Sequence, residues 1–153
     1  MVRTANESDA AFILKLLAEV NLIHHEIRPD LFKVGTKYSE SDVKELLGSD
    51  NVHIFICEED GVRCGYLIGY EEETEETQLR THIRTFYIDD LCVDSDVRGK
   101  GAGRQLYEYA VAYARDNGFY NVTLHVWGGN DSAESFYRRM GLTTQFTCLE
   151  KIL

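Results

Sequence analysis

The chain has 153 residues, 44% of them hydrophobic and 27% charged, and its formal net charge is −10. This length suits a single domain over residues 1–153, and the acidic balance argues against nucleic-acid binding and against binding to an anionic membrane surface. No apolar run approaches the roughly 20 residues of a membrane span. The first residues also lack the apolar segment of a secretory signal, so we expect a cytoplasmic protein.

The first half of the chain predicts two helices. Apolar residues recur at helical spacing over residues 5–25, which predicts an amphipathic helix. Residues 28–38 have no such period and predict a loop. A capping box from Ser39 to Asp42 predicts a short helix over residues 39–47.

The next segment predicts a β-hairpin over residues 51–70. β-branched and aromatic runs flank Asp60 and Gly61, which together form a turn signal. Residues 71–77, EEETEET, carry five carboxylates in seven residues. This run predicts a solvated connection, and the alternative is a local negative field that attracts polyamines or basic peptides.

The second half of the chain alternates strands and helices. The expected order is a strand over 82–93, a helix over 101–118, a strand over 121–127, a helix over 130–142 and a closing strand over 143–153. With a short first strand over 2–4, this order predicts an α/β fold with a mixed sheet. The helix after Gly103 is expected to connect two parallel strands.

Four cysteines stand at positions 57, 64, 92 and 148. No two of them form a C-x-x-C pair, so we expect no zinc or other metal site. Cys57, Cys64 and Cys92 lie in apolar, strand-like runs, and we expect them to be reduced thiols in the core.

A glycine-rich segment, VRGKGAGRQL at Val97–Leu106, follows an expected strand and begins an expected helix. Free backbone N–H groups at a helix N-terminus favour anions, and glycine lets the backbone approach a phosphate closely. The plain alternative is a tight turn with surface cations. The segment lacks the G-x-x-x-x-G-K-[ST] pattern of a P-loop, and no acid follows at the spacing of a dinucleotide fold.

Two motifs together resemble one known family. VRGKGAG resembles the R/Q-x-x-G-x-G/A signature of the GNAT superfamily of acetyl-CoA-dependent N-acetyltransferases, and NDSAESFYRRMGL resembles that family's N-x-x-A-x-x-F-Y-x-x-x-G segment. The resemblance covers about residues 2–152. It implies a single-domain α/β fold with a mixed, mostly antiparallel sheet of about six or seven strands and about four helices. Members of the family are often dimers, which suggests a homodimer by analogy.

The resemblance also implies a function and a cofactor site. The chain would use acetyl-CoA and transfer its acetyl group to a primary amine of a small molecule or peptide, by direct attack on the thioester. Loop amides would hold the pyrophosphate, and the backbone of the preceding strand would pair with the pantetheine arm. The implied cofactor-binding residues are Leu91, Cys92, Val93, Arg98, Gly99, Lys100, Gly101, Ala102, Gly103, Arg104, Asn130, Ala133, Phe136 and Tyr137.

An alkyl ammonium has a pKa near 10.4, so such an enzyme needs a base for the amine and an acid for the leaving thiolate. The resemblance implies Tyr137 as the acid. Asp89 or Asp90 is the expected base, directly or through a water. As neighbours on one strand they are expected to point to opposite faces of the sheet. His125 is a third candidate, because imidazole titrates near neutral pH.

The acceptor site is less well specified by the sequence. His24, His25, Glu26 and Arg28, together with His125, are candidate acceptor contacts, and the alternative for the first four is a solvated loop. Two other functions remain open. One is a non-catalytic acyl-CoA-binding or regulatory module on the same fold, and the other is a nucleotide- or phosphate-binding protein unrelated to coenzyme A.

Overall fold

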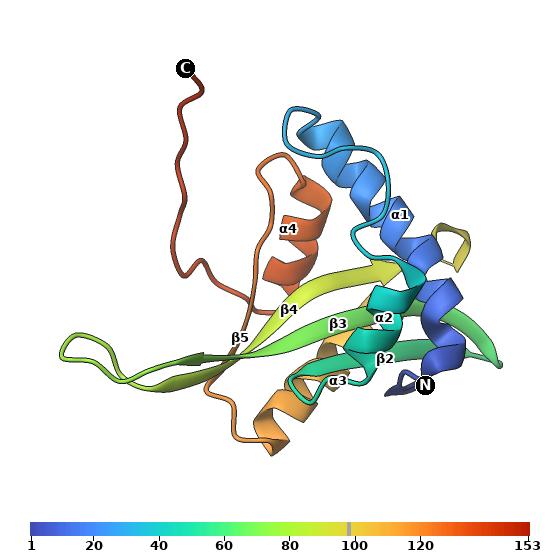
Figure 1. Ribbon diagram of the computed structural model, residues 1–153, viewed down its shortest axis with the longest axis horizontal. Helices are drawn as coiled ribbons and strands as arrows, with labels where there is room; N and C mark the ends of the chain where they lie inside the picture. Colours follow the sequence, from blue (N-terminus) through green and yellow to red (C-terminus); the bar gives the residue numbers. More distant parts are fainter. Residues whose placement is uncertain (98) are drawn as a thin grey trace.

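A five-stranded sheet forms the centre of the computed structural model, which describes residues 1–97 and 99–153 (Figure 1). Its strands, in spatial order, are β1 (Val2–Thr4), β2 (Val52–Glu59), β3 (Val62–Thr74), β4 (Ile83–Val93) and β5 (Asn121–Leu124). All neighbours are antiparallel except β4 and β5, which are parallel. The mixed, mostly antiparallel sheet is thus confirmed, whereas the expected count of six or seven strands is too high.

Four α-helices cover the two faces of the sheet, as predicted. They are α1 (Ala10–Ile27), α2 (Glu40–Leu47), α3 (Ala102–Asp116) and α4 (Asp131–Arg139), and short 3₁₀ turns precede α1 (Glu7–Asp9) and α3 (Ser95–Val97). Side chains of α1 and α2 pack on one face, and those of α3 and α4 pack on the other. Figure 1 shows α2 in front of the sheet and α3 behind it.

The core on each face follows from strand alternation. Ile54 and Ile56 of β2 are buried against α1 and α2, whereas the intervening Phe55 is buried against α3. The predicted turn of the β2–β3 hairpin is confirmed, with positive φ at Asp60 and Gly61. Three cysteines are buried and form no disulfide, as expected of core thiols: Cys57, Cys64 and Cys92.

Two strand predictions fail at the end of the chain. β5 ends at Leu124 and not at residue 127, and residues 143–153 form no strand. Within the described residues, no backbone hydrogen bond links residues 143–153 to the rest of the chain, and Figure 1 shows this segment leading away from the sheet. Its sequence has strand-type alternation, but a strand also needs a neighbour whose backbone it can pair with.

The acidic run of residues 71–77 is mainly strand, which corrects the expected polar connection. β3 continues to Thr74 because β4 is long enough to pair with it: Glu71 lies opposite Phe86, and Thr74 lies opposite Ile83. The acidic side chains therefore lie on a long hairpin that extends beyond the helices in Figure 1.

A β-bulge interrupts β4 at Asp89. Ile68 of β3 pairs with Asp90 and the next residue, Gly69, pairs with Ile88, so Asp89 is an additional residue. It shifts the alternation by one position, and the carboxylates of Asp89 and Asp90 both lie on the side of α1 and α2. The expectation that they face opposite sides is wrong, because it assumed an uninterrupted strand.

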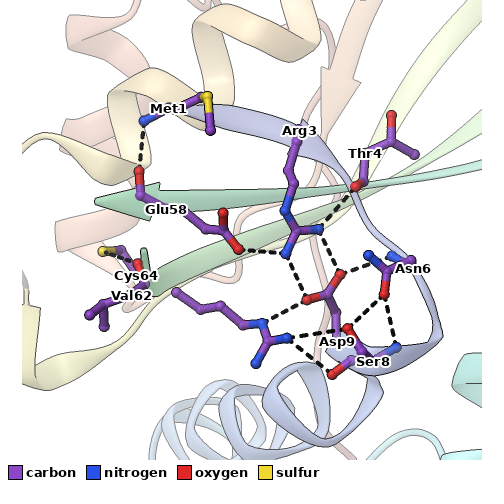
Figure 2. Close-up of polar contacts among 10 residues, drawn as sticks. Met1, Arg3, Thr4, Asn6, Ser8, Asp9, Glu58, Val62 and Cys64 are labelled. Carbon is purple, nitrogen blue, oxygen red and sulfur yellow. Dashed lines mark hydrogen bonds and ion pairs between the residues drawn. The ribbon is translucent and has the colours of Figure 1, made fainter. Parts of the chain in front are cut away.

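A buried carboxylate links the beginning of α1 to the sheet. Asp9 has no exposed surface, and its oxygens accept hydrogen bonds from Arg3 at 2.8 Å, Arg63 at 2.7 Å and the backbone N–H of Asn6 at 2.9 Å. Arg3 also binds Glu58 of β2 (Figure 2). These contacts lower the pKa of Asp9 to about 2, although burial alone would raise it. This cluster of side chains connects β1, β2 and β3 to the 3₁₀ turn that precedes α1.

Over residues 1–97 and 99–153, no helix combines the length and the apolar character needed to cross a bilayer.

Candidate active site

The glycine loop ends at the N-terminus of α3. Gly99 and Gly101 have φ of 89° and 85°, a left-handed conformation that glycine adopts without strain. Gly101 is the N-cap of α3, and neither a side-chain cap nor an acidic residue occupies the first turn. The N–H groups of this turn can therefore bind an anion. Arg98, expected to take part, lies outside the described residues.

The two cations described beside this loop, Lys100 and Arg104, are at the surface. Lys100 Nζ lies 3.9 Å from a carboxylate oxygen of Glu59, and Arg104 pairs with Glu108 at 2.7 Å. Both side chains are more than half exposed, so these pairs contribute little stability and can be exchanged for a phosphate. The neighbouring Ala102 is buried.

The end of β4 meets α3 and α4 at Gly103. A Cβ atom at Gly103 would lie 3.4 Å from Val93, 3.6 Å from Phe136 and 3.7 Å from Leu91. The expected cofactor residues of strand, loop and last helix are thus brought together. The pairing of β4 with β5 ends at Ile88, although β4 continues to Val93.

Asn130 has a structural role in addition to any contact with a cofactor. Its Oδ1 accepts a hydrogen bond from the N–H of Ala133 at 3.2 Å, which makes Asn130 the N-cap of α4. The cap fixes the direction in which α4 begins, and through it the placement of Ala133 and Tyr137 on that helix.

Tyr137 projects from α4 toward β4. Its ring lies 5.1 Å from that of Phe136 and 6.4 Å from that of Tyr107. Burial raises the pKa of the Tyr137 phenol, and the nearby charge of Asp90 raises it further. Tyr137 therefore stays protonated at neutral pH and can donate a proton.

Asp89 and Asp90 share one cationic partner, Lys37. Its Nζ lies 2.5 Å from Asp89 Oδ2 and 3.9 Å from Asp90 Oδ2. Asp90 is 8% exposed, and its buried Oδ2 accepts no hydrogen bond from the described residues. Burial raises the pKa of Asp90 to about 7, the charge of Asp89 adds to the rise, and Lys37 opposes it. This carboxylate can therefore take up and release a proton near neutral pH.

Several tyrosines that the sequence did not single out surround this carboxylate pair. Tyr66 is fully buried, and its hydroxyl has no hydrogen-bond partner among the described residues. Burial raises the pKa of Tyr66 well above its usual value, and Asp90 adds to the rise. The hydroxyls of Tyr38 and Tyr70 lie 2.9 Å apart. Tyr66 and Tyr70 stand four residues apart on one strand and therefore lie on the same face of the sheet. This spacing could have indicated from the sequence that the two tyrosines belong to one site.

An open groove of about 470 Å³ lies beside the outer half of β4. Its walls combine polar and apolar surface in about equal parts and come from β3, the β3–β4 connection, β4, β5 and its end, and the C-terminal segment: Glu72, Thr74, Arg80, Thr81, Ile83, Thr85, Tyr87, Thr123, His125, Gln145 and Phe146. His125 follows the end of β5, and its Nδ1 lies 3.3 Å from the hydroxyl of Tyr87. Burial raises the pKa of Tyr87, which lines the groove, and the charge of Asp89 adds to the rise.

The four candidate residues near the end of α1 differ in their surroundings. His24 packs against Phe32 with ring centroids 5.2 Å apart, and burial and the charge of Lys37 lower its pKa. His25 instead contacts the backbone oxygen of Phe32 at 2.6 Å. Arg28 forms ion pairs with two surface carboxylates, and Glu26 is exposed. His24 is thus linked to the carboxylate pair through the charge of Lys37.

Known proteins resemble this chain in sequence over most of its length. The model of the acetyltransferase (GNAT) family matches residues 20–142. An uncharacterized N-acetyltransferase of Bacillus subtilis, YhfO, is 31% identical over 92% of this chain and 87% of its own. An uncharacterized N-acetyltransferase of Methanocaldococcus jannaschii is 30% identical over 69% of this chain, and the matched region spans only 45% of that protein.

Solved structures show the same fold. A mutant of the BH1408 protein of Bacillus halodurans has a TM-score of 0.96 and 24% identity, over 100% of this chain and 99% of its own. An aminoglycoside acetyltransferase from a soil metagenome, solved with sisomicin, has a TM-score of 0.69 and 20% identity, over 100% of this chain and 95% of its own.

Proposed function

The chain belongs to the acetyltransferase (GNAT) family, and from this premise we propose that it transfers an acetyl group from acetyl-CoA to a primary amine. The observation that carries the proposal is the pairing of two groups with complementary proton affinities. Asp90 titrates near neutral pH, and Tyr137 holds its proton more tightly than an ordinary phenol. One can accept a proton while the other donates one, as amine acylation requires.

The residues at the other side of the site fit coenzyme A. The first turn of α3 offers uncapped N–H groups for a pyrophosphate, with Lys100 and Arg104 nearby. Leu91 and Val93 would bind the pantetheine arm through their backbones. When bound, acetyl-CoA supplies the acetyl group as an activated thioester.

We assign the binding of the acceptor and each proton transfer to residues of the chain. Asp89 and Asp90 bind the acceptor as an ammonium ion, and Asp90 accepts the proton that makes the nitrogen nucleophilic. Tyr137 donates a proton or hydrogen bond to the sulfur that leaves. The groove beside Tyr87 would bind the rest of the acceptor, and the aminoglycoside acetyltransferase of the same fold supports a polar amine.

Turnover should depend on Asp90 with a defined pH profile. We expect kcat/KM to rise with pH through about 7, where Asp90 loses its proton. Asp90→Asn should lower kcat/KM by about 100-fold at pH 8 and remove that limb of the profile. The control is Asp96→Asn, which changes an exposed carboxylate just after β4. An unchanged profile in Asp90→Asn would exclude Asp90 as the base.

The Asp90→Asn substitution should stabilise the folded protein at pH 8 although it lowers activity. A raised carboxyl pKa means that the folded protein binds more protons than the unfolded chain between pH about 4 and about 7, so Asp90 lowers stability as the pH rises through this range. Asp90→Asn removes this effect and should raise the melting temperature at pH 8 by about 2–6 °C. A loss of activity together with a gain in stability distinguishes a base from a structural carboxylate.

The proposal is tested by binding and by turnover. Calorimetry should show binding of acetyl-CoA, and coenzyme A release should be followed with polyamines, aminoglycosides, amino acids and peptides. Gly101→Asp should weaken acetyl-CoA binding by about 10-fold or more, because it places a carboxylate at the N-terminus of α3. Gly118→Asp is the matched control, since Gly118 also has positive φ but follows the C-terminus of that helix.

The alternatives give different results. Tight acetyl-CoA binding without release in the presence of any amine would favour a regulatory module. Binding of ATP but not of acetyl-CoA would favour a phosphate-binding protein of another kind, and either result would overturn the proposal.

A further inference from the structure

The ammonium group of Lys37 lies where the proposed acceptor amine would bind. Its Nζ is 2.5 Å from Asp89 Oδ2 and 3.9 Å from Asp90 Oδ2. The side chains of both carboxylates are 15% exposed or less, whereas that of Lys37 is 45% exposed. A primary amine on a flexible carbon chain, approaching from the surface, thus already occupies the position at which an alkylamine substrate would be bound.

The loop that carries Lys37 is attached on both sides. Asn21 of α1 donates hydrogen bonds to the backbone oxygens of Lys33 at 2.7 Å and Gly35 at 2.9 Å. After Lys37, Tyr38 contacts Tyr70 and Ser39 caps α2. Because these contacts hold the loop in place, the Lys37 amine has a high effective concentration at the carboxylates of Asp89 and Asp90. Lys33, four residues earlier, has an exposed side chain and makes no ion pair among the described residues, so the placement is specific to Lys37.

We propose that Lys37 is itself an acetyl acceptor and that the site acetylates it when no other amine is present. This inference rests on the proposed function. Asp90 accepts a proton from the Lys37 ammonium, the nitrogen forms a bond to the acetyl carbon, and the bond between that carbon and the sulfur breaks. Of the two protons that the ammonium loses overall, one ends on the coenzyme sulfur and one is released to water. Nothing is oxidised or reduced.

The modification has a consequence for the site. An amide carries no charge, so acetylated Lys37 no longer neutralises Asp89 and Asp90, and the added acetyl group remains beside them. An amine substrate competes with Lys37 for the same carboxylates and should protect it. Acetylation of Lys37 is thus expected to be fastest in the absence of an acceptor.

The test is intact-protein mass spectrometry after incubation with acetyl-CoA alone, followed by peptide mapping. We expect one acetyl group, on Lys37, added at least about 10-fold faster than on Lys33. Lys37→Arg should abolish this modification, and the matched control Lys33→Arg should leave it unchanged. Tyr137→Phe should slow it by about 10-fold or more, which chemical acetylation by free acetyl-CoA would not show.

Three results overturn the inference. If an added amine is acetylated and Lys37 remains unmodified when the amine is omitted, the inference fails and the proposed function stands. The same holds if an added amine is acetylated but acetyl groups appear on many lysines at rates that Tyr137→Phe does not change. If acetyl-CoA does not bind, the proposed function fails and the inference fails with it.

Discussion

Replacing Tyr137 by phenylalanine is expected to lower kcat by about 100- to 1,000-fold while the affinity for acetyl-CoA stays within about twofold. The substitution removes one hydroxyl and keeps the ring that packs against Phe136 and Tyr107. The lost group is a hydroxyl whose pKa is raised by burial, so the parent protein carries this proton throughout the neutral range. Single-turnover rates and calorimetry on the same preparations separate the chemical step from binding.

Tyr107→Phe is the matched control. Tyr107 is buried, its pKa is likewise raised by burial, and its ring contacts that of Tyr137. Its substitution should change kcat by less than about threefold if the effect belongs to the Tyr137 hydroxyl and not to the packing of tyrosines. Equal turnover in parent and Tyr137→Phe would remove the acid assignment.

Replacing Asp9 by asparagine is expected to destabilise the protein by about 3–5 kcal/mol at pH 7. Asparagine keeps the shape of the side chain but leaves Arg3 and Arg63 facing a neutral amide with no exposed surface. It also places an NH₂ group where an oxygen accepts a hydrogen bond. Urea unfolding of the parent and the variant measures the difference.

The pH dependence gives an independent check on Asp9. Its folded-state pKa of about 2 lies below the usual value, so its contribution is complete above pH about 4 and is lost as the pH falls toward 2. The difference between parent and Asp9→Asn should therefore narrow in acid. Glu7→Gln, in the same 3₁₀ turn but exposed, should change stability by less than about 0.5 kcal/mol. A difference below about 1 kcal/mol for Asp9→Asn would contradict the role assigned to the cluster.

Sequence reasoning predicted the elements whose signals are local. The capping box at Ser39 and the turn at Asp60 and Gly61 lie where they were expected, because each depends on a few neighbouring residues. The glycine loop precedes α3 for the same reason. The family followed from two motifs of this local kind.

The acceptor side could not be predicted in this way. Lys37 is 52 residues from Asp89 in sequence, and only the folded loop brings their side chains together. The bulge in β4 was hidden as well, since Asp89 and Asp90 fit an ordinary strand pattern. Residues 143–153 show the converse error. Their sequence has a strand pattern, but in the described part of the chain they pair with no neighbouring strand.

The bulge also makes strand length a determinant of the site. Without Asp89, regular alternation would still place Ile88 and Leu91 toward α3, and Asp90 and Cys92 toward α1. Asp89 is therefore equivalent to an inserted residue: it supplies a second carboxylate without changing the side on which any other residue of β4 packs. The insertion of one codon into an already stable fold can thus create a site with two adjacent carboxylates. Deletion of that codon would remove the site, and in both cases the packing of the core stays the same.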